Sequence, residues 1–307
     1  MNKKLIGSVL LFAAAVLWGT TFVAQSKGME YVEPFTYNSI RMYIGGIVLI
    51  PVVLVFGRKN QKNSTAAAVD THTTVKGGIC CGVVLFAASS LQQCGMVMTS
   101  AGKAGFITAL YIVIVPLFEL ILFKRRAPAA LWFCIVIAAF GFYLLCIKKG
   151  FTLDKGDVLI LFCSFFFAGH IIVVDHFNKR GVNGILMSCL QFFTAGTLML
   201  IVMLLKEKPV LDSIIAARYT ILYAGIMSSG LAYTFQIIGQ KHTPPAIATL
   251  TMSLESVIAA VSGWAVLGEH LSHKELLGCV LVFAAVLASQ FTPSSDKKGA
   301  EVQVLDT

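Results

Sequence analysis

Apolar residues fill ten long runs along the chain, separated by short polar segments. A run of about 20 apolar residues can cross the hydrocarbon core of a bilayer as a helix. A backbone in lipid must satisfy its own hydrogen bonds, so such runs form helices. The pattern predicts an all-α integral membrane protein with ten transmembrane helices. The predicted spans are 5–25, 35–56, 76–97, 101–123, 128–147, 157–177, 184–205, 218–240, 244–267 and 274–291.

The first run begins like a signal peptide, with Lys3 and Lys4 ahead of apolar residues. It continues through Trp18 to Val23, however, which is longer than the usual apolar region of about 7–15 residues. We therefore predict that it is the first transmembrane helix.

Composition agrees with a membrane protein. The chain has 307 residues, of which 57% are hydrophobic and only 13% are charged. Soluble chains carry about 25% charged residues. The net charge of +9 does not indicate nucleic-acid binding, because the basic residues lie in short clusters between the apolar runs. Such clusters are typical of topology signals.

The eight cysteines all fall in apolar runs and form no CxxC pair. We interpret them as small apolar helix residues and predict neither disulfides nor thiolate metal ligands. His270 and His273 are three residues apart but lack further ligands nearby. The sequence therefore predicts no metal site and no cofactor.

The basic residues also predict an orientation. If the N-terminus is cytoplasmic, the inner segments hold 14 of the Lys and Arg residues and the outer segments hold 9, with the strongest cluster at Lys124-Arg125-Arg126. An excess of positive charge marks the cytoplasmic side. We expect a protein of the bacterial plasma (inner) membrane with both termini in the cytoplasm. The tail 293–307 is expected to be disordered.

The two halves of the chain resemble each other. Shifting the first span by 149 positions places Gly7 on Gly156, and shifting the third to fifth spans by 144 places Gln92 on Gln236. The register holds without a gap over about seventy residues, which indicates an internal repeat. The matched pairs in that stretch include Ala88 with Ala232, Gly95 with Gly239, Thr99 with Thr243, Leu110 with Leu254 and Ile114 with Ile258.

Five spans per half is an odd number, so the second half must enter the membrane from the opposite side. This predicts two inverted five-helix repeats, at 1–150 and 151–292. Secondary transporters commonly have this architecture, with a substrate site near the midplane between the halves.

Glu255 lies near the middle of the apolar run Ala246–Leu267. A carboxylate at this depth costs about 2.5–3.5 kcal/mol on insertion scales, so a functional role in transport or proton relay is the first interpretation. The alternative is a structural acid that is hydrogen-bonded between helices.

Polar residues follow one face of several predicted helices, and such faces must contact protein or water. Cavity lining and plain interhelical hydrogen bonding, at about 0.6 kcal/mol per contact, are both open for these residues. Trp18 and Tyr111 could equally be packing aromatics. The stripes are Ser229, Tyr233, Gln236 and Gln240; Ser89, Gln92 or Gln93, Met96 and Ser100; Trp18, Thr21 and Gln25; and Thr251, Glu255 and Ser262. Tyr111 occupies the position equivalent to Glu255.

Two further ionisable groups lie within predicted spans. Arg41 could reach the outer surface with its long side chain, or pair with Glu255, or attract an anionic substrate group. His170 could shuttle a proton near neutral pH, or it could be a neutral, hydrogen-bonded residue.

Several motifs resemble the drug/metabolite transporter superfamily, EamA type. These permeases have ten spans in two repeats, and the resemblance covers about residues 5–291. Members commonly show Glu-Pro where this chain has Glu255-Ser256, so no proline kink is expected there. The motifs are Trp18-Gly19-Thr20-Thr21-Phe22, Arg41, Thr99–Thr108 running to Pro116, Leu254-Glu255-Ser256 through Glu269, and Leu276-Leu277-Gly278.

The resemblance implies an inner-membrane exporter or facilitator of small metabolites, amino acids or drugs. The predicted inverted repeat adds transport by alternating access through a central cavity, which a proton gradient could drive. The expected partners are a small-molecule substrate, protons and the lipid bilayer, and no nucleic acid. We expect the protein to be a monomer or a homodimer. The expected cavity residues are Trp18, Thr21, Arg41, Gln92, Tyr111, His170, Tyr233, Gln236 and Glu255.

Two other functions remain as alternatives to transport. A membrane-embedded enzyme could begin from His170, Asp175 and His176, although no clustered metal ligands or activated nucleophile accompany them. A non-transporting sensor or assembly subunit is the other. We expect no enzymatic activity.

Overall fold

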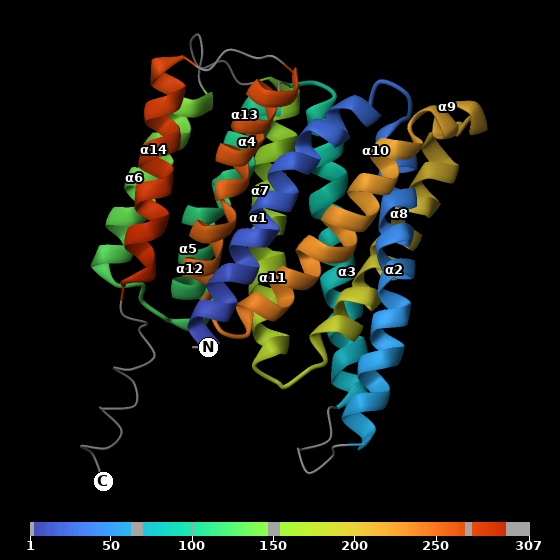
Figure 1. Cartoon of the computed structure of the whole chain (residues 1–307), viewed down its shortest axis with the longest axis horizontal. Helices are drawn as coiled ribbons and strands as arrows, with labels where there is room; N and C mark the ends of the chain where they lie inside the picture. The colour runs from blue at the N-terminus through green and yellow to red at the C-terminus, as the bar shows by residue number, and fades with distance from the viewer. Residues whose placement is uncertain (1–2, 63–69, 100, 147–153, 268–271, 293–307) are drawn as a thin grey trace.

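The computed structural model describes residues 3–62, 70–99, 101–146, 154–267 and 272–292, and every regular element in them is a helix (Figure 1). The predicted tail 293–307 and His270 lie outside these residues. The helices are α1 (Lys3–Gly28), α2 (Pro34–Lys62), α3 (Thr71–Met96), α4 (Ala101–Ala109), α5 (Tyr111–Phe123), α6 (Ala129–Cys146), α7 (Lys155–Asn178), α8 (Gly184–Lys206), α9 (Leu211–Ala216), α10 (Arg218–Tyr223), the π-helix η1 (Ala224–Ala232), α11 (Tyr233–Gln240), α12 (Pro245–Met252), α13 (Leu254–Leu267) and α14 (His273–Gln290).

Among the described residues, eight helical stretches are long and apolar enough to cross a membrane. Two predicted spans, the fourth and fifth, fall on the shorter apolar stretches Ile107–Phe123 and Ala129–Leu144. The helical class and the membrane-spanning character are therefore confirmed, and the count of ten crossings stays a prediction.

Three predicted spans are interrupted rather than continuous. The fourth breaks at Leu110 between α4 and α5, and the ninth breaks at Ser253 between α12 and α13. The eighth contains nine residues of π-helix between α10 and α11. The break at Ser253 needs no proline: the N–H of Ser256 donates to the carbonyl of Ser253 at 3.1 Å, a tight turn that replaces the α-helical bond.

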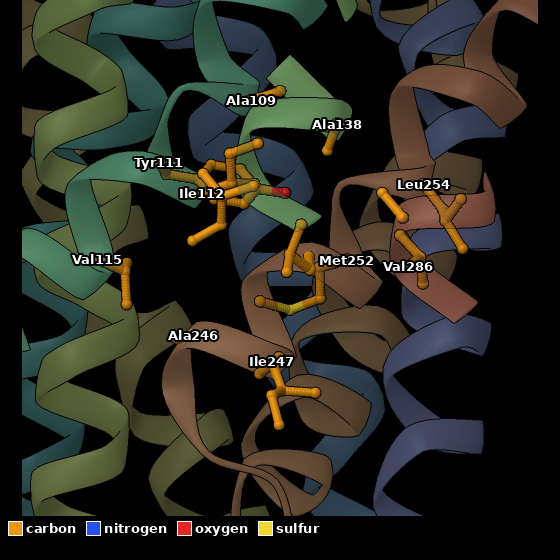
Figure 2. Packing of buried hydrophobic residues seen from close by; sticks show 14 of the residues in the cluster. Ala109, Tyr111, Ile112, Val115, Ala138, Ala246, Ile247, Met252, Leu254 and Val286 are labelled. Atoms are coloured by element: carbon orange, nitrogen blue, oxygen red, sulfur yellow. The ribbon is translucent and has the colours of Figure 1, made fainter. Parts of the chain in front are cut away.

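The two broken helices pack together in the largest apolar cluster, where Figure 2 labels Tyr111 and Ile112 from α5 and Met252 and Leu254 beside the second break. At the edge of this cluster α6 packs along α14 (Figure 1). On the other side of the molecule α2 packs along α8, and α3 packs against both α7 and α8.

Both ends of the described chain lie at the same end of the bundle (Figure 1). The Lys4 ammonium donates to the carbonyl of Gln290 at 2.7 Å, and the Ser8 hydroxyl donates to Oε1 of Gln290 at 2.8 Å. These bonds tie the start of α1 to the end of α14.

Two glycine contacts bring helix backbones unusually close. A Cβ added at Gly7 in α1 would lie 2.9 Å from the carbonyl oxygen of Gly239 in α11. A Cβ added at Gly156 in α7 would lie 2.9 Å from the carbonyl oxygen of Gly95 in α3. Gly7 and Gly156 are equivalent in the predicted repeat, and so are Gly95 and Gly239, so the two contacts correspond to each other.

Candidate functional site

A cavity lies within the bundle, with about 520 Å³ of empty space that includes the solvent at its opening. Its walls come from α1, α2, α3, α4, α5, α7, η1, α11, α12 and α13. Eight of the nine residues predicted as cavity lining meet here: Trp18, Arg41, Gln92, Tyr111, His170, Tyr233, Gln236 and Glu255. The remaining wall residues are Phe22, Gln25, Thr108, Phe167, Ile171, Ser228 and Met252.

Glu255 and Tyr111 are joined directly across the cavity wall. The Tyr111 hydroxyl donates to Oε1 of Glu255 at 3.0 Å, and both side chains are buried. Each lies in the first turn after a helix break, Tyr111 after Leu110 and Glu255 after Ser253. The pair therefore holds a carboxylate at the point where two helices are interrupted, and its second oxygen remains available to another donor.

Arg41 supplies a positive charge to the same cavity. It is only 2% exposed, and its Nε donates to Oδ1 of Asn38 at 2.7 Å. Asn38 is held in turn by the carbonyl of Ser89, which accepts from its Nδ2 at 3.0 Å. Across the described part of the chain no carboxylate lies within ion-pair distance of Arg41. The Arg41 side chain therefore stays inside the bundle and does not reach the outer surface, which was one of the alternatives from the sequence.

His170 is buried at the back of the cavity and is hydrogen-bonded to Gln191, with Nε2 and Oε1 3.0 Å apart. The ring of Tyr233 packs edge-on against His170 and against Trp18, with centroids 5.9 Å and 4.9 Å away. These rings form an aromatic part of the cavity wall.

Several polar atoms of the wall have no protein partner. Among the described residues, Nε1 of Trp18, Oε1 of Gln25 and Oε1 of Gln236 are buried without a hydrogen bond. Gln92 has only a long bond, from its Nε2 to Oγ1 of Thr108 at 3.4 Å. Buried polar groups normally find partners, so orphaned ones around a cavity indicate a place for water or a ligand.

Thr21 is the one predicted cavity residue outside this set. It is fully buried, and its hydroxyl donates to the carbonyl of Leu17 at 2.5 Å within its own helix. The face of α1 that meets the cavity carries Trp18, Phe22 and Gln25 instead. Gln25 could be found from the sequence, because it lies on the same polar stripe as Trp18. Phe22 is apolar, so no pattern in the sequence distinguished it from a lipid-facing residue.

The described residues contain no group of three or more His, Cys, Asp or Glu side chains that could hold a metal ion. The suggested enzymatic trio is also dispersed, because His170 lines the central cavity while Asp175 pairs with Lys179 at 2.6 Å near the end of α7.

The profile of the EamA-like transporter family matches residues 5–147 and again residues 154–290. The chain belongs to the EamA-like transporter family. This EamA-like protein is 26% identical to an uncharacterized transporter of Archaeoglobus fulgidus over 93% of its own length and 86% of the relative's. It is 27% identical to the uncharacterized inner membrane transporter YedA of Escherichia coli K12, over 91% and 89% of the two chains.

A protein of solved crystal structure shares the fold, with a TM-score of 0.75 at 18% identity, covering 92% of this chain and 96% of the other. Together, the family and the apolar helices establish the EamA-like protein as a multi-pass membrane transporter.

Proposed function

We propose that this protein is a secondary transporter that exports small zwitterionic metabolites, amino acids above all, through the central cavity. One observation carries the proposal: Arg41 and Glu255 line the same cavity, and neither forms an ion pair among the described residues. Unpaired buried charges are costly, and a ligand with a carboxylate and an ammonium group would compensate both.

The polar atoms left without partners fit the same ligand class. The orphaned oxygens of Gln25 and Gln236 are acceptors and would receive the N–H groups of an ammonium, while Nε1 of Trp18 would donate to a carboxylate. The aromatic wall of Trp18 and Tyr233 would accommodate the apolar part of the substrate.

The proposed mechanism is alternating access between two inverted five-helix repeats, with ten crossings in all. Two observations support it. The family profile matches twice, and the Gly7–Gly239 contact corresponds to the Gly156–Gly95 contact when the repeats are exchanged. Tyr111 and Glu255 are equivalent positions that bond to each other, as expected for a pair on the axis relating the repeats.

Both termini are proposed to be cytoplasmic, in a bacterial plasma membrane. The bonds from Lys4 and Ser8 to Gln290 place the two ends of the described chain together, and the excess of Lys and Arg lies in the segments of that side. Glu255 is the proposed carrier of a coupled proton when the substrate leaves.

The extracellular metabolite profile of expressing cells tests the proposal, compared with cells that express Glu255→Gln at an equal membrane level. We expect a small set of amino acids or other zwitterionic carboxylic acids to be enriched only by the parent protein. Identical profiles from the two strains would count against export through this cavity and would leave Glu255 a structural role. A matched control is Gln93→Met, since Gln93 is buried but does not line the cavity.

A further inference from the structure

A second cavity, with about 1130 Å³ of empty space that includes open solvent, lies at the end of the bundle where Lys4 and the chain's start are found. We call it the vestibule. The residues of its wall that matter here are Arg125, Asn178, Lys179, Gln240, Lys241 and Thr243. None of them was expected to belong to a site, although Gln240 ends the polar stripe of the eighth predicted span.

Three buried side chains of the vestibule have a polar atom without a partner among the described residues: Oδ1 of Asn178, Oε1 of Gln240 and Oγ1 of Thr243. Each residue is less than 9% exposed. The amide orientations follow from backbone carbonyls, because Asn178 donates to Ile237 at 2.8 Å and Gln240 donates to Ile171 at 3.3 Å. With each nitrogen used as a donor, an acceptor oxygen remains free.

The wall of the vestibule carries more basic than acidic side chains: those of Lys4, Arg125, Lys179 and Lys241 against those of Glu119 and Asp175. Lys241 donates to the carbonyl of Val182 at 3.1 Å and has no carboxylate partner among the described residues. Asp175 is already shared between Lys179, at 2.6 Å, and Arg125, at 3.7 Å. Burial lowers the pKa of the Lys241 amine, so its ammonium form would gain from an anion nearby.

The vestibule and the central cavity share a wall. Gln236 and Gln240 stand one turn apart on α11, the first lining the central cavity and the second lining the vestibule. The hydrogen bond from Gln240 reaches the carbonyl of Ile171, whose residue lines the central cavity. The two cavities are thus neighbours, and each has a cationic side chain and acceptor oxygens without a partner among the described residues in its wall.

From this arrangement we infer that the vestibule is a second binding site, which receives a zwitterionic amino acid before it passes to the central cavity. The carboxylate would meet Lys241, and the ammonium group would donate to Gln240 and Asn178. This inference rests on the proposed transport function and adds a site to it.

The test measures transport of a uniformly radiolabelled mixture of the common L-amino acids, added at one face of the membrane or at the other. Right-side-out and everted membrane vesicles give access to the two faces. The variant is Gln240→Met, which conserves volume but removes the acceptor. When substrate is added at the face that carries the N-terminus, the half-saturation concentration should rise about tenfold, the effect of one hydrogen bond to a charged group. Added at the opposite face, substrate should give the parent's value. Protease access to an N-terminal tag identifies the faces.

Gln93→Met is the matched control, because Gln93 is fully buried with both polar atoms unpartnered yet lines neither cavity. It should change neither value. A change that is equal at both faces, or no change with Gln240→Met, would overturn the vestibule site. A parent protein that moves no compound of the mixture would overturn the proposed function itself. The thermal midpoint of each purified variant shows whether it is folded.

Discussion

Arg41 and Glu255 bring opposite charges into one cavity without an ion pair to each other or to any other described residue. Each is instead oriented by a neutral neighbour, Arg41 by Asn38 and Glu255 by Tyr111. Neutral partners fix a charged group in place without cancelling its charge. The two residues therefore keep charges that a bound ligand can compensate.

At this scale we predict that Arg41→Gln lowers the transport of carboxylate substrates about tenfold or more, the effect of losing a charged hydrogen bond. Arg41→Lys should restore part of the rate, because it keeps the charge but not the planar fork that matches a carboxylate. The measurement is uptake in proteoliposomes at equal protein content. Equal rates for Arg41→Gln and the parent would exclude a substrate role for Arg41.

A double-mutant cycle tests the bond between Tyr111 and Glu255. Tyr111→Phe removes the donor, and Glu255→Leu removes the acceptor. We expect a coupling of about 1 kcal/mol in the free energy of unfolding, measured by denaturant titration in micelles. Additive effects of the two substitutions would show that the 3.0 Å contact does not stabilise the fold.

At the scale of helices, the start of α2 depends on a residue far away in the chain. Both carboxylate oxygens of Glu207, at the end of α8, accept hydrogen bonds of 2.7 Å, from the N–H groups of Phe35 and Thr36 and from the Thr36 hydroxyl. The first N–H groups of a helix have no partner within it, so this acid acts as a distant cap. It also fixes the first turns of the helix that carries Arg41.

We predict that Glu207→Ala destabilises the protein by about 1–2 kcal/mol, because buried N–H groups lose their acceptor. The unfolding midpoint in micelles measures this change. Glu30→Ala is the control: its carboxylate pairs with Lys27 at the surface, where such pairs contribute about 0–1 kcal/mol. Similar midpoints for the two variants would contradict the capping role.

At the scale of the whole molecule, the two glycine contacts bring α1 against α11 near one end and α3 against α7 near the other. We predict that Gly7→Ala and Gly156→Ala each lower stability by about 1–3 kcal/mol, because an added methyl group would overlap a backbone oxygen. Gly169→Ala should be tolerated, since the only atom near its added Cβ is 3.8 Å away. Denaturant titration compares the three, and equal stability would rule out a close-packing role for these glycines.

The arrangement of the whole chain also predicts its topology. A reporter that is active only in the cytoplasm should work when it is fused after Arg126, and an alkaline phosphatase, active only outside, should work after Lys208. Arg125 lines the vestibule together with Lys4, so it lies on the side of the N-terminus. Glu207 caps the start of α2, which lies at the other end of the bundle. The reversed pattern of activities would place the termini outside.

The sequence by itself determined the helical class, the membrane location, the family motifs and most of the cavity-lining residues. It could do so because hydropathy and helical spacing are local properties, and lipid permits few alternatives to a helix. An ionisable or amide side chain at mid-span has to face the interior, so Gln236 and Glu255 could be assigned to it without coordinates, whereas Arg41 could also have reached the outer surface.

Only the tertiary structure decided how the helices are rotated and where they break. Thr21 shares a predicted face with Trp18 and Gln25, yet its hydroxyl donates to the carbonyl of Leu17 in its own helix, and Phe22 lines the cavity in its place. The break at Ser253, the bond between residues 144 positions apart and the vestibule around Gln240 depend on contacts between distant segments. A pattern within one segment carries no information about which distant segment lies opposite.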